Sequence, residues 1–213
     1  MKIIKPEAQI LFPVDGVQML KNLERIGRVC YKSEDKITED SYIPFLGRIL
    51  RSGHESVIEH EKASVRAICD RGVSHELVRH RIASYSQEST RYCNYTGEKF
   101  GGELTFIRPF FWAEDARQYE IWKRVMQQAE DAYAELLGLG ATPQEARSIL
   151  PNSLKTEIVM TMNMREWRHF FRLRLAPAAH PQMRELCGIL LREFLGAIPL
   201  LFDEFEPLLE DCP

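Results

Sequence analysis

Alternation of apolar and polar residues predicts the strands of this chain. From Ala63 to Cys69 every second residue is apolar, and Lys62, Ser64, Arg66 and Asp70 alternate with them, as expected of a strand with one buried face. Residues 155–162 alternate in the same way, and residues 3–12 indicate a further strand. Two shorter segments, 91–95 and 104–108, are expected to pair as a hairpin that encloses the polar residues between them.

Apolar residues spaced three and four apart, bounded by capping residues, predict the helices. Asp15 is expected to cap the first one. Thr142 and Glu145 form a capping box with proline at the first helical position, and Asn163 with Glu166 is expected to form a second box. The predicted helices span about 15–30, 38 or 41 to 53, 114–137, 143–150, 163–174 and 181–209.

The stretch Ser74–Tyr92 gathers cations and hydroxyl groups in one short region. Ser74 is expected to cap a helix, so that Arg79–Arg81 fall near its C-terminus, where the helix dipole favours cations. Guanidinium groups with short hydroxyl and amide donors are typical of phosphate sites. A solvated helix end is the alternative. The donors in the following loop, just before Arg91, are Ser84, Ser86, Gln87, Ser89 and Thr90.

Composition restricts the possible partners. The 213 residues are 45% hydrophobic and carry a net charge of -3, so residues 1–213 are expected to form a single domain with one core. This charge gives no general attraction to nucleic acid or to an anionic membrane. The five cysteines include no Cys-x-x-Cys pair, and the N-terminus lacks the apolar core of a signal peptide. We therefore expect a soluble cytoplasmic protein with reduced thiols.

The segment His54–His60 superficially suggests a metal site. Its two histidines are six residues apart, so on a helix they would point about 120° away from each other, unlike the i, i+4 pair of a zinc site. Glu55 and Glu59 would share a helical face and could serve as an acid–base pair, although exposed carboxylates rarely do. No metal is expected.

A longer pattern resembles a known family. Arg79–Arg81, seven residues, Ser89 and then Arg91-Tyr92 are similar to the signature of the flavin-dependent thymidylate synthases, and residues 146–151 match their Ala-Arg-x-x-Leu-Pro pattern. The resemblance extends from His54 to Gln182. It implies an α+β fold with a central antiparallel or mixed sheet flanked by helices. It also implies a homotetramer whose active sites are shared between subunits.

The resemblance implies a reaction as well. Family members convert deoxyuridine monophosphate (dUMP) to thymidylate (dTMP) by reductive methylation. The carbon comes from 5,10-methylenetetrahydrofolate, the hydride from reduced FAD, and NADPH re-reduces the flavin. The protein then contributes chiefly positioning and electrostatics. Arg174 is the implied catalytic residue, which would stabilise negative charge on the uracil ring.

The resemblance assigns further contacts residue by residue. This chain departs from the common family pattern at Ser86, Gln87 and His169, where many members carry Asn, Glu and Asn, and at Glu76, where some carry Gln. The implied flavin contacts are Ser56, Arg79, His80, Arg81, Ile82, Gln87, Asn163, His169 and His180. The implied dUMP contacts are Glu76, Arg79, Gln87, Glu88, Ser89, Thr90, Arg91, Arg147 and Arg174.

Three alternatives accompany these assignments. The stripe Asn163, Trp167, Phe170 and Arg174 would either wall a planar ligand or form an ordinary core face. The basic helix and aromatic loop could instead belong to a module that binds RNA or single-stranded DNA, which the negative net charge disfavours. A hydrolase that pairs Ser84 or Ser89 with His80 is the least favoured, because no relay that would activate a serine is legible.

Overall fold

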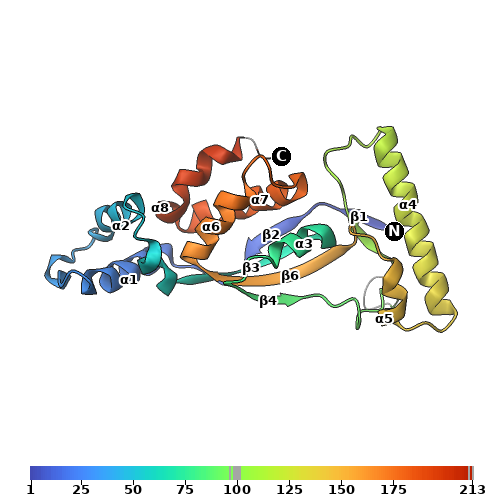
Figure 1. Ribbon diagram of the computed structural model, residues 1–213, viewed down its shortest axis with the longest axis horizontal. Coiled ribbons are helices and arrows are strands. Elements are labelled where there is room, and N and C mark those ends of the chain that lie inside the picture. Colours follow the sequence, from blue (N-terminus) through green and yellow to red (C-terminus); the bar gives the residue numbers. More distant parts are fainter. Residues whose placement is uncertain (96, 98–101, 211, 213) are drawn as a thin grey trace. The chain divides into compact units, whose positions relative to one another are not determined.

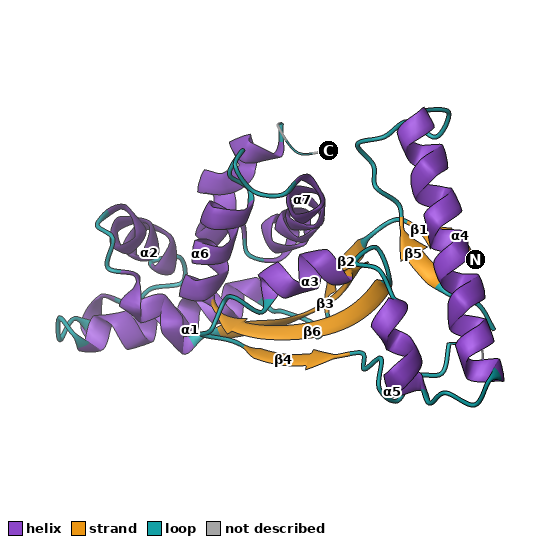
Figure 2. Cartoon of the chain, turned by 45° about the vertical axis from the view of Figure 1, so that its right-hand side comes forward, coloured by secondary structure: helices purple, strands orange, loops and turns teal. Residues whose placement is uncertain are grey.

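The computed structural model describes residues 1–95, 97, 102–210 and 212. Strands and helices alternate in an α+β fold (Figures 1 and 2). The strands are β1 (Lys2–Ile4), β2 (Glu7–Ile10), β3 (Lys62–Asp70), β4 (Ser84–Gln87), β5 (Thr105–Ile107) and β6 (Lys155–Asn163). The α-helices are α1 (Gly16–Val29), α2 (Tyr42–Arg51), α3 (Arg71–Leu77), α4 (Arg117–Gly138), α5 (Pro143–Ala146), α6 (Met164–Arg174), α7 (Pro181–Ala197) and α8 (Pro199–Phe202). The described 3-10 helices are η1 (Glu34–Lys36), η2 (Glu55–His60), η4 (Arg147–Ile149) and η5 (Asp203–Leu209).

The strands form two sheets. One has four strands in the order β2-β3-β6-β4, and the other pairs β1 with β5. Strands β3 and β6 run antiparallel, because the hydroxyls of Ser64 and Thr161 lie 2.8 Å apart while, farther along, the Arg71 N–H donates to the Leu154 carbonyl at 3.0 Å. The β1–β5 pair is parallel. The sheets are therefore mixed in direction, and helices accompany them, as expected.

The chain divides into two compact units. Unit 1 comprises Met1–Glu7, Ala67–Arg79 and Ser86–Val159, and unit 2 comprises Ala8–Arg66, His80–Tyr85 and Met160–Pro213. Four of the crossing points between units, after residues 7, 66, 85 and 159, fall inside strands β2, β3, β4 and β6. The expectation of a single domain stays a prediction.

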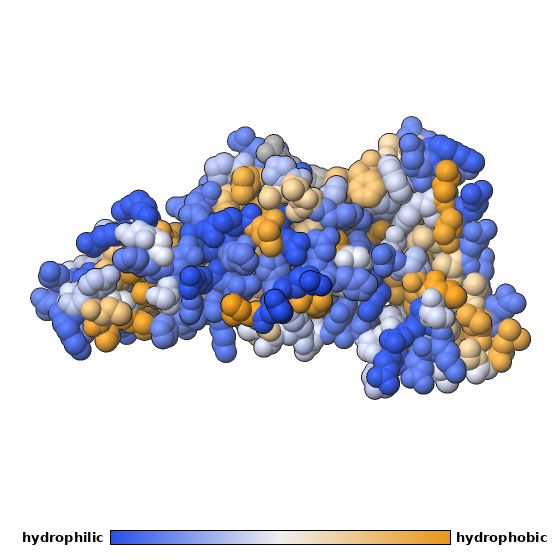
Figure 3. Space-filling model, viewed as in Figure 1, coloured by the Kyte–Doolittle hydropathy of each residue, from blue (hydrophilic) through white to orange (hydrophobic). Residues whose placement is uncertain are grey.

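Unit 1 is built on helix α4. Its apolar residues pack over the β1–β5 pair, which α4 accompanies in both ribbon views (Figures 1 and 2). The parallel register places Ile3 opposite Phe106. The opposite side of α4 leaves Ile121 and Val125 exposed, and apolar surface is visible along the helix in Figure 3. The buried core of unit 1 is Tyr95, Leu104, Phe106, Tyr119, Trp122, Met126, Tyr133, Ala146 and Leu154.

Unit 2 contains an aromatic core between helices α6, α7 and α8. Trp167 and Phe194 have ring centroids 4.9 Å apart, and Phe194 and Phe202 lie at 4.8 Å, distances at which aromatic pairs attract beyond simple burial. Helices α1 and α2 pack against each other beside this core. Both Trp167 and Phe170 are fully buried, so the ligand-wall interpretation of that stripe is wrong for these two side chains. They form a core face.

Several predicted elements are confirmed with small shifts. Ala63, Val65, Ala67 and Cys69 of β3 are buried as the alternation predicted. Asp15 caps α1 by accepting from the Gln18 N–H, and Thr142 and Glu145 form the capping box of α5. The strand expected at residues 3–12 is two strands, because the Lys5-Pro6 pair interrupts it and proline has no N–H for the ladder.

Two predicted elements are wrong. Strand β5 pairs with β1, whereas residues 91–95 form a turn, so the expected hairpin does not exist; residues 96 and 98–101 of its enclosed segment lie outside the described residues. The helix expected at 181–209 ends at Ala197, and the chain continues as α8 and η5. Pro199 explains the break, because a proline disfavours helical geometry in the residue before it.

Candidate functional site

Helix α3 begins earlier than expected, and this moves the basic cluster. Asp70 caps the helix by accepting from the Val73 N–H at 2.7 Å, whereas Ser74 lies inside the first turn and donates its hydroxyl to the Arg71 carbonyl. The helix ends at Leu77. The Ser74 cap is therefore wrong, and Arg79–Arg81 follow the helix rather than occupying its last turn.

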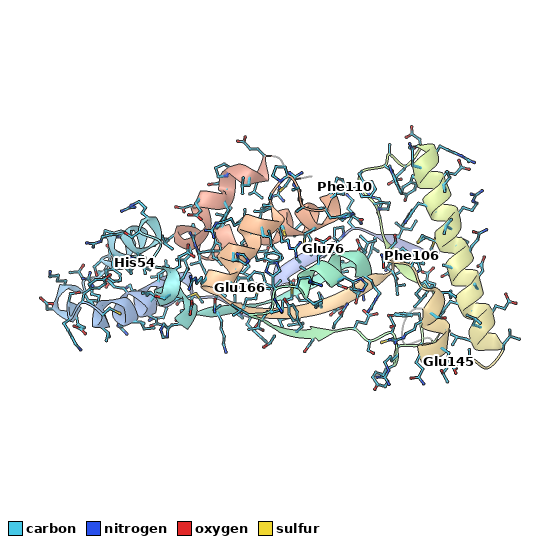
Figure 4. All side chains as sticks on the ribbon, in the orientation of Figure 1. His54, Glu76, Phe106, Phe110, Glu145 and Glu166 are labelled. Atoms are coloured by element: carbon cyan, nitrogen blue, oxygen red, sulfur yellow. The ribbon has the colours of Figure 1, made fainter. Side chains whose placement is uncertain are left out.

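In unit 2, His80 and Arg174 meet. His80 is 4% exposed, and its Nε2 accepts a hydrogen bond from Nε of Arg174 at 3.1 Å. Its Nδ1 lies 3.1 Å from Oε1 of Glu166, a residue of α6 that Figure 4 labels. The Tyr85 hydroxyl donates to the His80 carbonyl at 2.7 Å. The structure thus joins His80 and Arg174, two residues of the resemblance that are 94 positions apart along the chain. It also brings Glu166, 86 positions from His80, to the same imidazole.

The environment of His80 favours the neutral imidazole. Burial lowers the pKa of His80 below its ordinary value of 6.5; the Glu166 carboxylate opposes this shift, and the Arg174 guanidinium and His169 add to it. His80, Glu166 and His169 also place potential metal ligands within 4.8 Å of one another. Because the imidazole already bonds both Glu166 and a guanidinium, a cation there would meet an adjacent positive charge. The expectation of no metal stays a prediction.

A cavity of about 450 Å³ in unit 2 collects several residues of the expected flavin set. Among them Ile82 is 67% exposed, and Asn163 caps α6 by accepting from the Glu166 N–H at 2.8 Å. In a full capping box the Glu166 carboxylate would accept from the Asn163 N–H, but here that carboxylate contacts His80 instead. The lining residues are Glu55, Glu59, Ile82, Asn163, Arg165, Glu166, His169 and Arg172.

Two acidic residues of this cavity, Glu55 and Glu59, are paired with arginines, whereas Glu166 contacts His80. Glu59 accepts from Arg165 at 2.5 Å, and Glu55 accepts from the buried Arg168 at 3.1 Å. Since Glu55 and Glu59 lie on the 3-10 helix η2 and each has an arginine partner, they do not form the acid–base pair considered above. Sequence reasoning missed Arg165 as a lining residue.

The remaining unit 2 assignments lie outside the residues that line the cavity. Ser56 is exposed on η2, and Arg81 is exposed after His80. His180 caps α7, its Nδ1 accepting from the Gln182 N–H at 3.3 Å. Their assignment to flavin stays a prediction.

In unit 1, the segment from Gln87 to Thr90 is held by side-chain hydrogen bonds. The Gln87 amide donates to the hydroxyls of Ser74 at 2.9 Å and Thr156 at 3.1 Å. Glu88 accepts from Lys155 at 2.6 Å and from the Tyr95 hydroxyl at 2.8 Å. Burial and the Glu88 carboxylate raise the pKa of Tyr95, so this phenol stays protonated and donates.

Gln87, Glu88, Tyr95 and Lys155 line a cavity of about 530 Å³. Among the described residues that line it, Lys155 is the one cation, and it is paired with Glu88. Glu157 lies 3.8 Å from the same lysine, and Glu103 is paired with the N-terminal ammonium. The described lining residues offer a phosphate only a lysine that is already paired, so the predicted phosphate site rests on arginines that do not line this cavity. Sequence reasoning missed Lys155 as a lining residue, because a lysine in an alternating strand is expected on the exposed face. The lining residues are Ser86, Gln87, Glu88, Tyr95, Glu103, Thr105, Leu154, Lys155, Glu157 and Val159.

The arginines expected to bind phosphate lie on the surface of unit 1. Arg147 donates to the buried Thr90 hydroxyl at 3.4 Å, which brings together residues 57 positions apart. Arg79 and Arg91 are exposed, and the Ser89 hydroxyl accepts from the Arg91 N–H at 3.3 Å. Glu76 is half-buried on α3 (Figure 4).

Comparison with known proteins identifies the family of this chain. The family model for the thymidylate synthase complementing protein matches residues 17–200. The flavin-dependent thymidylate synthase of Pyrococcus furiosus is 38% identical over 182 residues, which cover 85% of this chain and 74% of that protein. The same enzyme of Geobacter sulfurreducens is 36% identical over 196 residues, covering 87% and 82%.

A solved structure shares the fold. The UMP/dUMP methylase PolB of Streptomyces cacaoi, crystallised with 5-Br dUMP, superposes with a TM-score of 0.80 over 97% of both chains, at 18% identity. From the family match and these relatives, the chain belongs to the thymidylate synthase complementing protein family, Thy1, the family of the flavin-dependent thymidylate synthases.

Proposed function

We propose that this protein is a flavin-dependent thymidylate synthase that converts dUMP to dTMP. The observation that carries the proposal is the family match over residues 17–200, joined by relatives named for this activity. In the net reaction the hydrogen on C5 of uracil is replaced by a methyl group. Methylenetetrahydrofolate supplies the CH2 unit and a hydride from reduced FAD completes the methyl group, with NADPH as the reductant of the flavin.

The residues of the unit 2 cavity fit a flavin dinucleotide. Arg165 and Arg172 offer guanidinium donors for its phosphates, the Asn163 amide offers donors and an acceptor, and the exposed Ile82 offers an apolar contact for a ring. Arg165 already pairs with Glu59 and Arg172 with Glu204, so these guanidinium groups would share their donors between the carboxylates and the phosphates. Ser56, Arg79, His80, Arg81, Gln87, His169 and His180 complete the proposed flavin contacts.

The nucleotide is proposed to bind through unit 1. Arg91 and Arg147 would hold the phosphate with Ser89 and Thr90, because a guanidinium and short hydroxyl donors match phosphate oxygens. The Arg147 contact with Thr90 supports this pairing. Further proposed dUMP contacts are Glu76, Arg79, Gln87, Glu88 and Arg174.

Arg174 is the proposed catalytic residue. Its guanidinium would stabilise negative charge that develops on the uracil ring as C5 attacks the one-carbon unit. A group aimed in this way lowers the barrier because it is already oriented before the reaction starts. Its hydrogen bond to the buried His80 supplies such an orientation.

We further propose a cytoplasmic homotetramer with shared active sites. Residues of several chains would then combine at each site, and the exposure of Arg79, Arg91 and Arg147 is compatible with contact across subunits. Sedimentation equilibrium should give four times the 24.8 kDa of one chain, and a monomer at assay concentration would remove this part of the proposal. Among the described residues, no helix is long and apolar enough to cross a bilayer.

The deciding experiment uses the purified protein. We expect yellow protein whose visible flavin absorbance bleaches with NADPH and shifts when dUMP is added, and dTMP formation that requires methylenetetrahydrofolate. A colourless protein that forms no dTMP when FAD is supplied would contradict the proposal. Steeply salt-dependent oligonucleotide binding by that colourless protein would favour a nucleic-acid module instead.

A further inference from the structure

One face of α6 carries three residues at four-residue intervals, Glu166, Phe170 and Arg174, and residues with this spacing lie above one another on a helix. The His80 ring covers the middle of this face. It meets Phe170 edge-on with a centroid distance of 5.0 Å and an interplanar angle of 65°. Its two nitrogens reach Glu166 on one side and Arg174 on the other.

The direction of these hydrogen bonds fixes where the imidazole proton lies. An arginine Nε–H can only donate, so Nε2 of His80, 3.1 Å away, must accept and carries no proton. A neutral imidazole then holds its proton on Nδ1, which donates to the Glu166 carboxylate at 3.1 Å. The tautomer protonated on Nε2 would instead set two donors against each other at Arg174.

We propose that Glu166, acting through His80, is a positioning residue that orients the Arg174 guanidinium for the reaction. This inference rests on the proposed function and adds Glu166 and an indirect role for His80 to it. Glu166 is suited to the role because it lies in the first turn of α6, where the helix dipole stabilises its charge. Arg174 is the last residue of the same helix, where a cation is stabilised.

The chain of bonds has a defined order of dependence. Glu166 selects the His80 tautomer, the tautomer presents a lone pair at Nε2, and the lone pair fixes the Nε–H of Arg174. Neighbours that fix a side chain's tautomer and orientation in this way support metal ligands and catalytic residues in other proteins. Loss of Glu166 should therefore impair Arg174 while leaving its charge in place.

The first test needs no catalysis. Nitrogen-15 NMR of labelled protein, with His80 assigned by comparison with the His80→Gln variant, should show a protonated Nδ1 and an unprotonated Nε2. Glu166→Gln should keep this tautomer, because the amide oxygen still accepts from Nδ1. A proton on Nε2 in the unmodified protein would overturn the inference, whatever reaction the protein catalyses.

The second test is kinetic. Glu166→Leu should lower kcat for dTMP formation roughly 10- to 100-fold, the range expected when a charge-assisted hydrogen bond and an aligned group are lost. Because Glu166 lines the unit 2 cavity, flavin content is measured for each variant and kcat is expressed per bound flavin. Glu166→Gln should recover activity to within roughly fivefold of the unmodified protein, since a neutral acceptor preserves most of the bond. Glu39→Gln, which breaks the exposed pair with Lys21, serves as the control and should leave kcat unchanged.

A double-substitution cycle separates this role from a structural one. Lysine at position 174 keeps the charge but has no Nε–H in the arginine position, so Glu166→Leu should change kcat less than about threefold when added to Arg174→Lys. An undiminished effect in that background would overturn the proposal. Should the leucine variant fail to fold, the glutamine variant and the NMR result decide. If the unmodified protein has the expected tautomer but makes no thymidylate, the proposed function is contradicted. The order of the hydrogen bonds would still stand.

Discussion

Replacing Arg168 with methionine should destabilise unit 2 strongly. The Arg168 side chain is 2% exposed and has three oxygen partners: Glu55 at 3.1 Å, Glu204 at 2.8 Å and the Leu201 carbonyl. The guanidinium also lies 5.4 Å from the centre of the Phe205 ring. Methionine retains much of the side-chain length but offers none of these donors, so its partners lose their charge-assisted hydrogen bonds.

The expected loss in free energy of unfolding is near the lower end of the range for breaking a buried ion pair. Removing one partner of such a pair costs about 3–5 kcal/mol, chiefly because the other charge stays buried. Two features reduce this cost. Glu204 is 47% exposed and can regain water, and Arg172, 3.7 Å from Glu55, still offers that carboxylate a cation. We therefore expect about 3 kcal/mol, which for a chain of this size lowers Tm by roughly 6–12 °C.

Urea unfolding followed by circular dichroism measures this loss. The matched control is Arg165→Met on the same helix, which breaks the Glu59 pair whose side chains are 51% and 43% exposed and should cost less than about 1 kcal/mol. Equal losses in the two variants, or less than about 1 kcal/mol for Arg168→Met, would refute the reasoning from burial.

The same substitution should weaken flavin binding. Glu55 lines the unit 2 cavity, and Arg168 provides its closest described ion pair. With Arg168 gone, the carboxylate presents more uncompensated charge to the phosphates of the cofactor. A second change, Glu55→Gln, should recover part of the flavin affinity measured by titration. Unchanged affinity in Arg168→Met would show that Glu55 has no influence on the bound cofactor.

Three further substitutions test the proposed roles. Arg174→Ala should reduce dTMP formation at least about 100-fold while flavin absorbance persists; normal turnover would remove Arg174 from catalysis. Arg91→Ala should raise the dUMP KM about 10- to 100-fold with a smaller change in kcat, and unchanged nucleotide affinity would contradict the phosphate contact. Because burial lowers the pKa of His80 below 6.5, unfolded protein binds the extra proton more readily, so the free energy of unfolding should fall as pH drops through 6.5. His80→Gln should lose that part of the pH dependence, and an identical pH dependence in both proteins would contradict it.

Alternation and capping residues predicted correctly those elements that depend on residues close together in the sequence. Burial along β3 follows directly from its alternation, and the α5 box requires only Thr142 and Glu145. At α3 two cap-forming residues compete, since Asp70 and Ser74 are both suited to the first position. Asp70 prevails because it already stands in extended conformation at the end of β3.

Pairings between distant segments could not be read in this way. The register of β1 with β5 joins Ile3 to Phe106, and neither segment carries a local mark of its partner. Strand β4 has the polar sequence Ser-Tyr-Ser-Gln and stands at the edge of its sheet, so it lacks the apolar alternation on which the strand prediction relied.

The candidate site was predictable only where a motif existed. The family pattern located His80 and Arg174 without showing that they touch. Glu166 was read solely as a capping residue because it stands three positions after Asn163. Its second role requires His80 to lie across α6, a packing arrangement that the spacing along the chain does not encode.

Four strands contribute residues to both units, and this limits how the chain can be divided into fragments. A protease or a truncated gene that separated unit 1 from unit 2 would have to sever β2, β3, β4 and β6 within their hydrogen-bonded ladders. Each fragment would then expose unpaired strand ends prone to aggregation. Assigning nucleotide and flavin functions by expressing halves is therefore unsuitable for this protein, and single-residue replacements in the intact chain are the appropriate route.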